Sequence, residues 1–223
     1  MPSVTFSQSL PFIAAAIVGY LLGALPFGVM VARWHGVDIF KVGSGNPGAT
    51  NVKRSIGRGA GNLVFALDFL KGAAAALWVR LLPADPAHGA WLGLIGLTAA
   101  ILGHSYSCFI RFRGGKGVAT TLGGAIALMP IAALISVVVW VVLFYSTRYV
   151  SLASIGLAAT LPVAVFFLNG LSELFGFAVL LALFVVIRHR ANVGRLLRGT
   201  ENRFVKKTAS DAPATEAPGN QKS

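Results

Sequence analysis

A glycine-rich polar segment covers residues 43–54, with the sequence GSGNPGATNVKR. Its glycines allow the backbone to turn N–H groups toward an anion, while small hydroxyl and amide side chains add neutral donors and Arg54 adds a planar cationic fork. This set suits a phosphate group, with a plain polar turn as the alternative. It is not a Walker loop, because the Gly-Lys-Ser/Thr ending is missing. The candidate site residues of this segment are Gly43, Ser44, Gly45, Asn46, Thr50, Asn51 and Arg54.

A second candidate segment begins at Gly103-His104 and continues through Arg111-Phe112-Arg113 to GGKGVATT, residues 114–121, which leads directly into an apolar stretch. The first turn of a helix has unpaired N–H groups, and with the helix dipole and a lysine these would hold an anion. Anchoring at a membrane surface is the alternative for the two arginines, but anchoring needs no glycines around a lysine. The candidates here are His104, Gly114, Gly115, Lys116, Gly117 and Thr120.

Two further pairs of polar residues share a helix face three residues apart. Asp68 and Lys71 lie within an apolar stretch, where charged side chains usually face a polar interior. Substrate contact and a mutually neutralised pair that pins helices remain equal alternatives for them. His189 and Asn192 lie where the last apolar stretch ends, among basic residues. They are candidates to face one ligand, with an ordinary interfacial polar pair as the alternative.

The composition indicates that these residues belong to an integral membrane protein. The chain has 223 residues, of which 56% are hydrophobic and 12% charged, against about 25% charged residues in soluble domains. Burying so much apolar surface in one small core is hard, so hydrocarbon is expected to solvate much of the outside. The formal net charge of +12 is expected to serve anionic lipid and small anions rather than nucleic acid. Cys108 is the only cysteine, so neither an internal disulfide nor a cysteine-based metal site is expected.

Apolar stretches suited to membrane helices, each needing about 20 residues, cover 10–32, 61–82, 89–110, 118–146, 151–168 and 174–187. The stretch 118–146 is too long for one untilted span, and Pro130 is expected to divide it. Seven crossings with the N-terminus outside place 17 of the 19 Lys and Arg residues at the cytoplasmic side. Six crossings would instead put the basic loop after the first stretch and the basic C-terminal segment on opposite sides of the membrane. We therefore predict an all-α polytopic membrane bundle of seven transmembrane helices, some short, with the C-terminus cytoplasmic. It covers residues 1–204, and a disordered cytoplasmic tail covers 205–223.

Taken together and in this order, the motifs resemble the bacterial acyl-phosphate:glycerol-3-phosphate acyltransferases, the PlsY family. The motifs are GSGNPGATNVKR, DFLKG of the second span, GH followed by RFRGGKGVATT, Ser151-Leu152-Ala153-Ser154 and HRANVGRLLRGTENR. The resemblance implies a seven-helix protein of the bacterial inner membrane with its site at the cytoplasmic face. It also implies acyl transfer from acyl phosphate to the 1-hydroxyl of glycerol 3-phosphate, with lysophosphatidic acid and phosphate as products. No metal, cofactor or obligatory protein partner is implied. The catalytic set carried over is Ser44, Arg54, Lys116, His189 and Asn192, with Asn51 and Ser154 lining the site.

The reaction that the resemblance implies needs no strong nucleophile, because acyl phosphate is already an activated anhydride. No aspartate follows His104 or His189 at the five-residue offset of soluble acyltransferases. His189 or an oxygen of a substrate phosphate could therefore take the hydroxyl proton, and the sequence leaves both open. A transporter of phosphorylated small solutes is the runner-up, although the candidate ligands crowd one side of the membrane and no inverted repeat is evident. A lipid-binding scaffold ranks third, since it would not explain the neutral donors beside the glycines.

Overall fold

The computed structural model describes residues 6–82 and 88–204, and in these parts of the chain every regular element is a helix. The predicted disordered tail, 205–223, lies outside the described residues. The first half of the chain forms α1 (Phe6–Ala24), α2 (Phe27–Trp34), α3 (Ala49–Ser55), α4 (Arg58–Leu77), the 3-10 turn η1 (Trp78–Leu81) and α5 (Gly89–Ser105). The second half forms η3 (Cys108–Ile110), α6 (Val118–Leu128), α7 (Pro130–Thr147), α8 (Val150–Asn169), α9 (Glu173–Arg188) and α10 (Arg190–Leu197).

Two prolines and one bend divide the apolar stretches. Pro130 is the first residue of α7, so the predicted division of 118–146 is confirmed; proline suits that position because the N–H it lacks would have no partner there. The stretch 10–32 is interrupted at Pro26, between α1 and α2. At His189 the chain bends by 60° between α9 and α10, which turns α10 across the end of the bundle.

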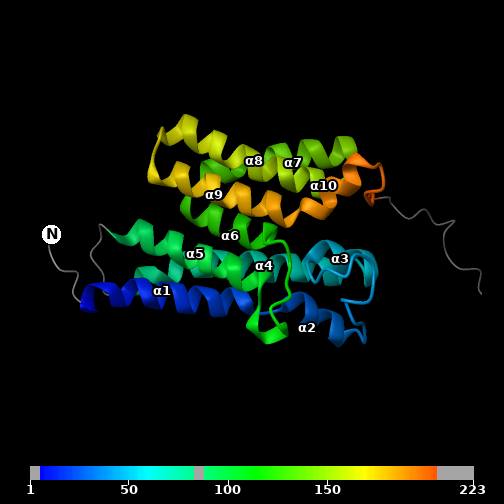
Figure 1. The fold of residues 1–223 in the computed structure, drawn as a ribbon, viewed down its shortest axis with the longest axis horizontal. Helices are drawn as coiled ribbons and strands as arrows, with labels where there is room; N and C mark the ends of the chain where they lie inside the picture. Colours follow the sequence, from blue (N-terminus) through cyan, green and yellow to red (C-terminus); the bar gives the residue numbers. More distant parts are fainter. Residues whose placement is uncertain (1–5, 83–87, 205–223) are drawn as a thin grey trace, which may run out of the picture.

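Figure 1 shows the helices as two groups with α6 between them. One group contains α1, α4 and α5, with α6 packed on α4, and the other contains α7, α8 and α9. The largest buried cluster joins them, with side chains such as Leu97 of α5, Ala125 of α6, Val165 of α8 and Leu181 of α9. The short helices α2, α3 and α10 gather at one end, which we call the α3–α10 end.

Small residues bring the helices of the first group into close contact. A Cβ atom at Gly23 of α1 would meet the backbone of Ala100 in α5, and one at Gly123 of α6 would meet the backbone of Phe69 in α4. In lipid, the hydrophobic effect does not drive helices together. Small residues let two backbones approach closely, and the van der Waals contact that results stabilises the packing.

The outer surface of the bundle is apolar, as expected for contact with lipid. Large side chains including Phe167 and Leu180 are exposed on it. Four helical stretches are long and apolar enough to cross a membrane, or five if α9 and α10 form one broken span. Helices α5 and α6 are shorter, with 17 and 11 residues. Each predicted span thus contains a helix, but length and composition alone support four or five crossings.

Candidate active site

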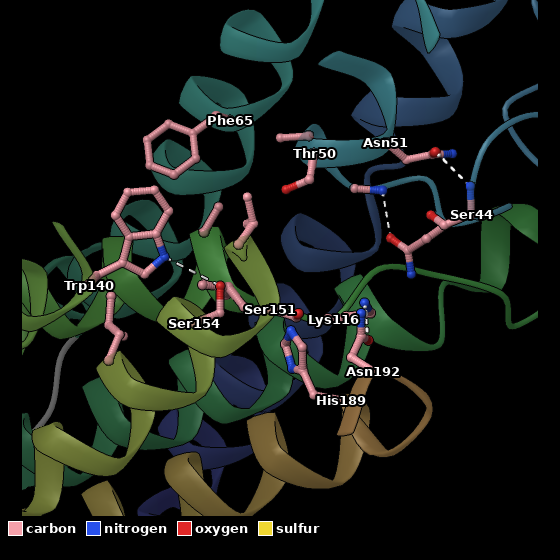
Figure 2. A pocket seen from close by; sticks show the side chains of 18 of the residues that line it. Ser44, Thr50, Asn51, Phe65, Lys116, Trp140, Ser151, Ser154, His189 and Asn192 are labelled. Atoms are coloured by element: carbon pink, nitrogen blue, oxygen red, sulfur yellow. Dashed lines mark hydrogen bonds between the residues drawn. The ribbon is translucent and has the colours of Figure 1, made fainter. Parts of the chain in front are cut away.

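One cavity of about 340 Å³ lies at the α3–α10 end, and it collects residues from all the predicted motifs (Figure 2). Twelve predicted site residues line it: Ser44, Asn46, Thr50, Asn51, Arg54, Asp68, His104, Lys116, Gly117, Ser154, His189 and Asn192. Segments that are far apart in the sequence therefore meet around a single space. The six remaining candidates do not line it: Gly43, Gly45, Lys71, Gly114, Gly115 and Thr120.

The Ser44 loop is held in shape by the buried side chain of Asn51. Its Oδ1 accepts a hydrogen bond from the backbone N–H of Ser44 at 2.9 Å, and its Nδ2 donates to the carbonyls of Ile39 and Val42. Gly43 has a φ of 56°, in the left-handed region, and a side chain there would strike the Asn51 amide. Asn51 and Gly43 thus position the loop, while the hydroxyl of Ser44 faces the cavity.

The Lys116 loop is fixed by contacts on both of its sides. The backbone N–H of Gly115 donates to the carbonyl of His104 at 3.1 Å, and Arg188 donates to the Gly115 carbonyl at 2.7 Å. A Cβ at Gly115 would meet the imidazole of His104, and Gly117 has a φ of 80° immediately before α6. The glycines therefore allow close packing and a sharp turn, which together place Lys116 beside the cavity.

Lys116, His189 and Asn192 lie close together, as the sequence predicts for candidates of one site. Nζ of Lys116 donates to Oδ1 of Asn192. Burial lowers the pKa of Lys116 to about 8, even though Glu201 nearby opposes the shift. In His189, Nδ1 lies 2.8 Å from the carbonyl of Val185. Because a carbonyl only accepts, Nδ1 carries the hydrogen of the neutral ring and Nε2 is left as an acceptor.

Glu201 is the main polar residue of the site that the sequence interpretation missed. Its buried carboxylate accepts hydrogen bonds from Ser151 at 2.8 Å, Asn192 at 2.7 Å and Arg195 at 2.7 Å. Burial alone would raise the pKa of Glu201, but these three donors hold it below the usual range. One signal for it was present, because Glu201 is the only acidic residue in the basic segment 188–204. A lone carboxylate in such a segment indicates an internal partner.

The chain beyond α10 borders the site at the end of the bundle. The guanidinium of Arg54 donates to the carbonyl of Asn202 at 3.0 Å, and the N–H of Phe204 donates to the carbonyl of Arg148 at 2.8 Å. Residues 199–204 therefore connect α3 to the turn between α7 and α8. Arg54 lines the cavity while one of its donors is used in this connection.

Asp68 and Lys71 form a buried ion pair of 2.8 Å in α4. Lys71 also donates to the carbonyl of Leu25 at 2.8 Å, next to the break between α1 and α2. Nδ1 of His104 lies 3.5 Å from Asp68. Of the two alternatives left open for this pair, the geometry favours pinning: Lys71 ties α4 to the α1–α2 break, and Asp68 supports the imidazole under the Lys116 loop.

The other part of the cavity is apolar, and the sequence interpretation named none of the residues that line it. Its walls come from α4, α6, α7 and α8: Phe65, Leu122, Val137, Trp140, Val141 and Leu157. Phe65 and Val141 are 45% and 41% exposed, so this part reaches the apolar outer surface between α4 and α7. Figure 2 shows Phe65 and Trp140 at the opposite end of the cavity from Ser44 and Asn192. The space therefore has a cationic end and an apolar end.

Comparisons with known proteins agree with this geometry. The family model described as glycerol-3-phosphate acyltransferase matches residues 13–199. The glycerol-3-phosphate acyltransferase of Aquifex aeolicus is 46% identical, with 84% of this chain and 96% of that protein covered, and the one of Fusobacterium nucleatum is 43% identical, with 86% and 98% covered. Crystal structures of PlsY (YgiH), an integral membrane glycerol 3-phosphate acyltransferase, match in two forms.

The glycerol 3-phosphate form is 42% identical, with a TM-score of 0.81 and with 87% of this chain and 96% of that chain covered. The lysophosphatidic acid form is 41% identical, with a TM-score of 0.79 and with 87% and 95% covered. The family match, residues 13–199, includes every segment that lines the cavity except residues 201 and 202. The chain belongs to the glycerol-3-phosphate acyltransferase family, as its resemblance to the PlsY proteins predicted.

Proposed function

We propose that this protein transfers a fatty acyl group from acyl phosphate to the 1-hydroxyl of glycerol 3-phosphate, giving lysophosphatidic acid and inorganic phosphate. One observation carries the proposal: a single cavity joins a cationic, hydrogen-bonding end to an apolar end that reaches the outer surface of the bundle. Both substrates are phosphate anions and one has a hydrocarbon chain, so this combination fits both at once.

Lys116 and Arg54 supply positive charge for the two phosphate groups, and Ser44 and Thr50 supply neutral donors. The acyl chain enters from the bilayer between α4 and α7 and lies against Phe65, which places its carbonyl carbon near the polar end. Asn46, also at this end, is an additional donor for glycerol 3-phosphate. Holding both substrates in one space replaces an encounter in solution with a positioned pair.

In the chemical step, the 1-hydroxyl oxygen of glycerol 3-phosphate attacks the acyl carbonyl carbon, and the bond between that carbon and the phosphate oxygen breaks. The departing phosphate takes the bonding electron pair. The hydroxyl proton passes either to Nε2 of His189 or to a phosphate oxygen of the substrate. Lys116 and the Asn192 amide stabilise the negative charge that develops on the oxygens. No covalent intermediate with the protein is required.

We further propose that the seven apolar helices α1, α4, α5, α6, α7, α8 and α9 each cross the inner membrane of a bacterium. The N-terminus is then outside, and the α3–α10 end faces the cytoplasm. The positive-inside rule supports this orientation, because Arg54, Lys116 and the basic segment 188–204 meet around the cavity at that end. Soluble glycerol 3-phosphate would then reach the cavity directly from the cytoplasm.

The test uses purified protein in nanodiscs with labelled glycerol 3-phosphate and, in parallel, palmitoyl phosphate, palmitoyl-CoA or palmitoyl-acyl carrier protein. We expect labelled lysophosphatidic acid with palmitoyl phosphate alone. Product from either thioester but not from palmitoyl phosphate would refute the proposed donor. Uptake of label into sealed vesicles without product would instead support a transporter of phosphorylated solutes.

A further inference from the structure

A second cavity, of about 480 Å³, lies outside the proposed active site. It is bounded by α2, by the turn that follows α2 and by the loop after α5. Three arginines line it: Arg33 from the last turn of α2, and Arg111 and Arg113 from the loop. The lining residues of this arginine groove do not overlap those of the active-site cavity.

The charge of the arginine groove is positive. Among the residues that the structure describes, Asp38 is the one acidic residue that lines it. This carboxylate accepts the backbone N–H of Phe40 at 3.1 Å and lies 3.8 Å from Nζ of Lys41, so its charge is already partly offset. Three guanidinium groups around one space suit a phosphate ester, because each presents a fork of N–H donors that matches the phosphate oxygens.

The loop has an unfavourable backbone conformation and specific contacts at its base. Anchoring the protein at the membrane surface by basic residues would require neither. Arg111 and Phe112 have φ angles of 57° and 55°, a region that is unfavourable for residues other than glycine. Ser107 fixes the base of the loop, since its hydroxyl donates to the carbonyl of Ala24 at 2.6 Å and its backbone pairs with Arg113. The guanidinium of Arg113 lies 3.8 Å from the ring centroid of Phe40. A basic residue that only anchors a protein can extend freely toward the headgroups.

Exposed aromatic side chains beside the arginine groove indicate that it faces lipid. Phe112 is 67% exposed, Trp34 at the end of α2 is 80% exposed, and Phe109 both lines the groove and remains exposed. Figure 1 shows the loop, in green, projecting from the flank of the bundle next to the α1–α2 break. Aromatic rings prefer the boundary between headgroups and hydrocarbon, which is where a lipid phosphate lies.

We propose that the arginine groove binds the phosphate headgroup of an anionic phospholipid from the surrounding bilayer, at a site separate from the proposed reaction. The phosphate lies among Arg33, Arg111 and Arg113, and the acyl chains run along the exposed aromatic rings. The site is independent of the proposed activity, because none of these residues lines the active-site cavity.

The test is native mass spectrometry of the protein with added phosphatidylglycerol, phosphatidylcholine or inorganic phosphate. The variant carries Arg33→Gln, Arg111→Gly and Arg113→Gln; glycine at position 111 suits the positive φ. The matched control carries Arg58→Gln, Arg190→Gln and Arg198→Gln, which removes the same charge from exposed positions outside both cavities. We expect one phosphatidylglycerol to bind the native protein, with about tenfold weaker binding in the groove variant and unchanged binding in the control.

Equal weakening in the control would overturn the proposal, because it would show attraction to overall charge. Equal binding of phosphatidylcholine would overturn it as well. Inorganic phosphate that binds as tightly as phosphatidylglycerol would identify a site for soluble anions and refute the assignment to lipid. If the triple variant does not fold, the single variant Arg33→Gln, at the end of a regular helix, decides. Weaker binding of phosphatidylglycerol by it supports the groove, and unchanged binding refutes it.

Discussion

Replacing Glu201 by glutamine tests whether the C-terminal segment organises the active site. The carboxylate accepts hydrogen bonds from Ser151 and Asn192 on Oε1 and from Arg195 on Oε2. Glutamine keeps one oxygen for the first two donors, but its NH2 group faces the N–H of Arg195. A hydrogen bond to a charged group contributes about 1.5–3 kcal/mol and a neutral one about 1 kcal/mol.

Losing the Arg195 bond and weakening the other two therefore costs about 3–5 kcal/mol, which the partial exposure of Arg195 reduces to about 2–4 kcal/mol. Asn192 also accepts from Lys116, so part of this energy orients the cation. If half of it, about 1–2 kcal/mol, acts on the transition state, kcat/KM falls by about 5- to 30-fold, at 1.36 kcal/mol per factor of ten. Thermal unfolding should also begin at a lower temperature.

The assay measures initial rates of lysophosphatidic acid formation and the unfolding temperature of the same nanodisc sample. Glu173→Gln is the matched control, because Glu173 is exposed at the start of α9, at the opposite end of that helix from the site. We expect it to behave as the native protein. If Glu201→Gln kept a rate within twofold of native and the same unfolding temperature, the proposed bracing role would be wrong.

Three further predictions concern charge, shape and packing. Lys116 loses its proton above its pKa of about 8, so the KM for glycerol 3-phosphate should rise by about fivefold from pH 8 to pH 9, and Lys116→Arg should remove this pH dependence. Trp140→Ala should enlarge the apolar end of the cavity beside Ser154 and shift kcat/KM toward longer or bulkier acyl phosphates. Gly123→Ala should lower stability by about 1–3 kcal/mol, because its Cβ would strike the α4 backbone.

Each of these predictions has its own contrary result. A KM that stays flat up to pH 9 would show that Lys116 does not hold the phosphate as a cation. Chain-length profiles that are identical for Trp140→Ala and native protein would place the acyl chain elsewhere. For the packing prediction, Gly176→Ala in α9 is the control, because the added Cβ would meet no other helix in the described part of the chain within 4 Å. Equal unfolding temperatures for both glycine variants would refute the close α4–α6 contact.

Much of the fold could be predicted from hydropathy and from single prolines. A continuous apolar stretch must satisfy its own backbone as a helix in lipid, so each predicted stretch contains one. Helix ends that depend on tertiary packing could not be predicted. The sequence predicts one stretch over 89–110, but α5 ends at Ser105, and Ser107 just beyond it donates a hydrogen bond to the carbonyl of Ala24. A contact over such a distance in sequence leaves no local pattern.

The polar part of the site could be predicted because phosphate chemistry needs unusual residues close together in the sequence, as around Ser44 and Lys116. The apolar part could not, because Phe65 and Trp140 look like any lipid-facing side chain until α4 and α7 are placed. For Lys71, the sequence indicates that a partner exists but not which group it is. A charged residue within a span indicates a polar partner, but only the fold shows that this partner is the Leu25 carbonyl as well as Asp68.

The most direct measurement is an experimental structure with glycerol 3-phosphate and a non-hydrolysable acyl phosphonate bound together. We predict both phosphorus atoms at the cationic end, near Arg54 and Lys116, with the glycerol 1-hydroxyl within reach of the acyl carbonyl and the acyl chain between α4 and α7. Ligands found in separate spaces, or an acyl chain that leaves the bundle by another route, would contradict the proposal that one cavity binds both substrates for direct transfer.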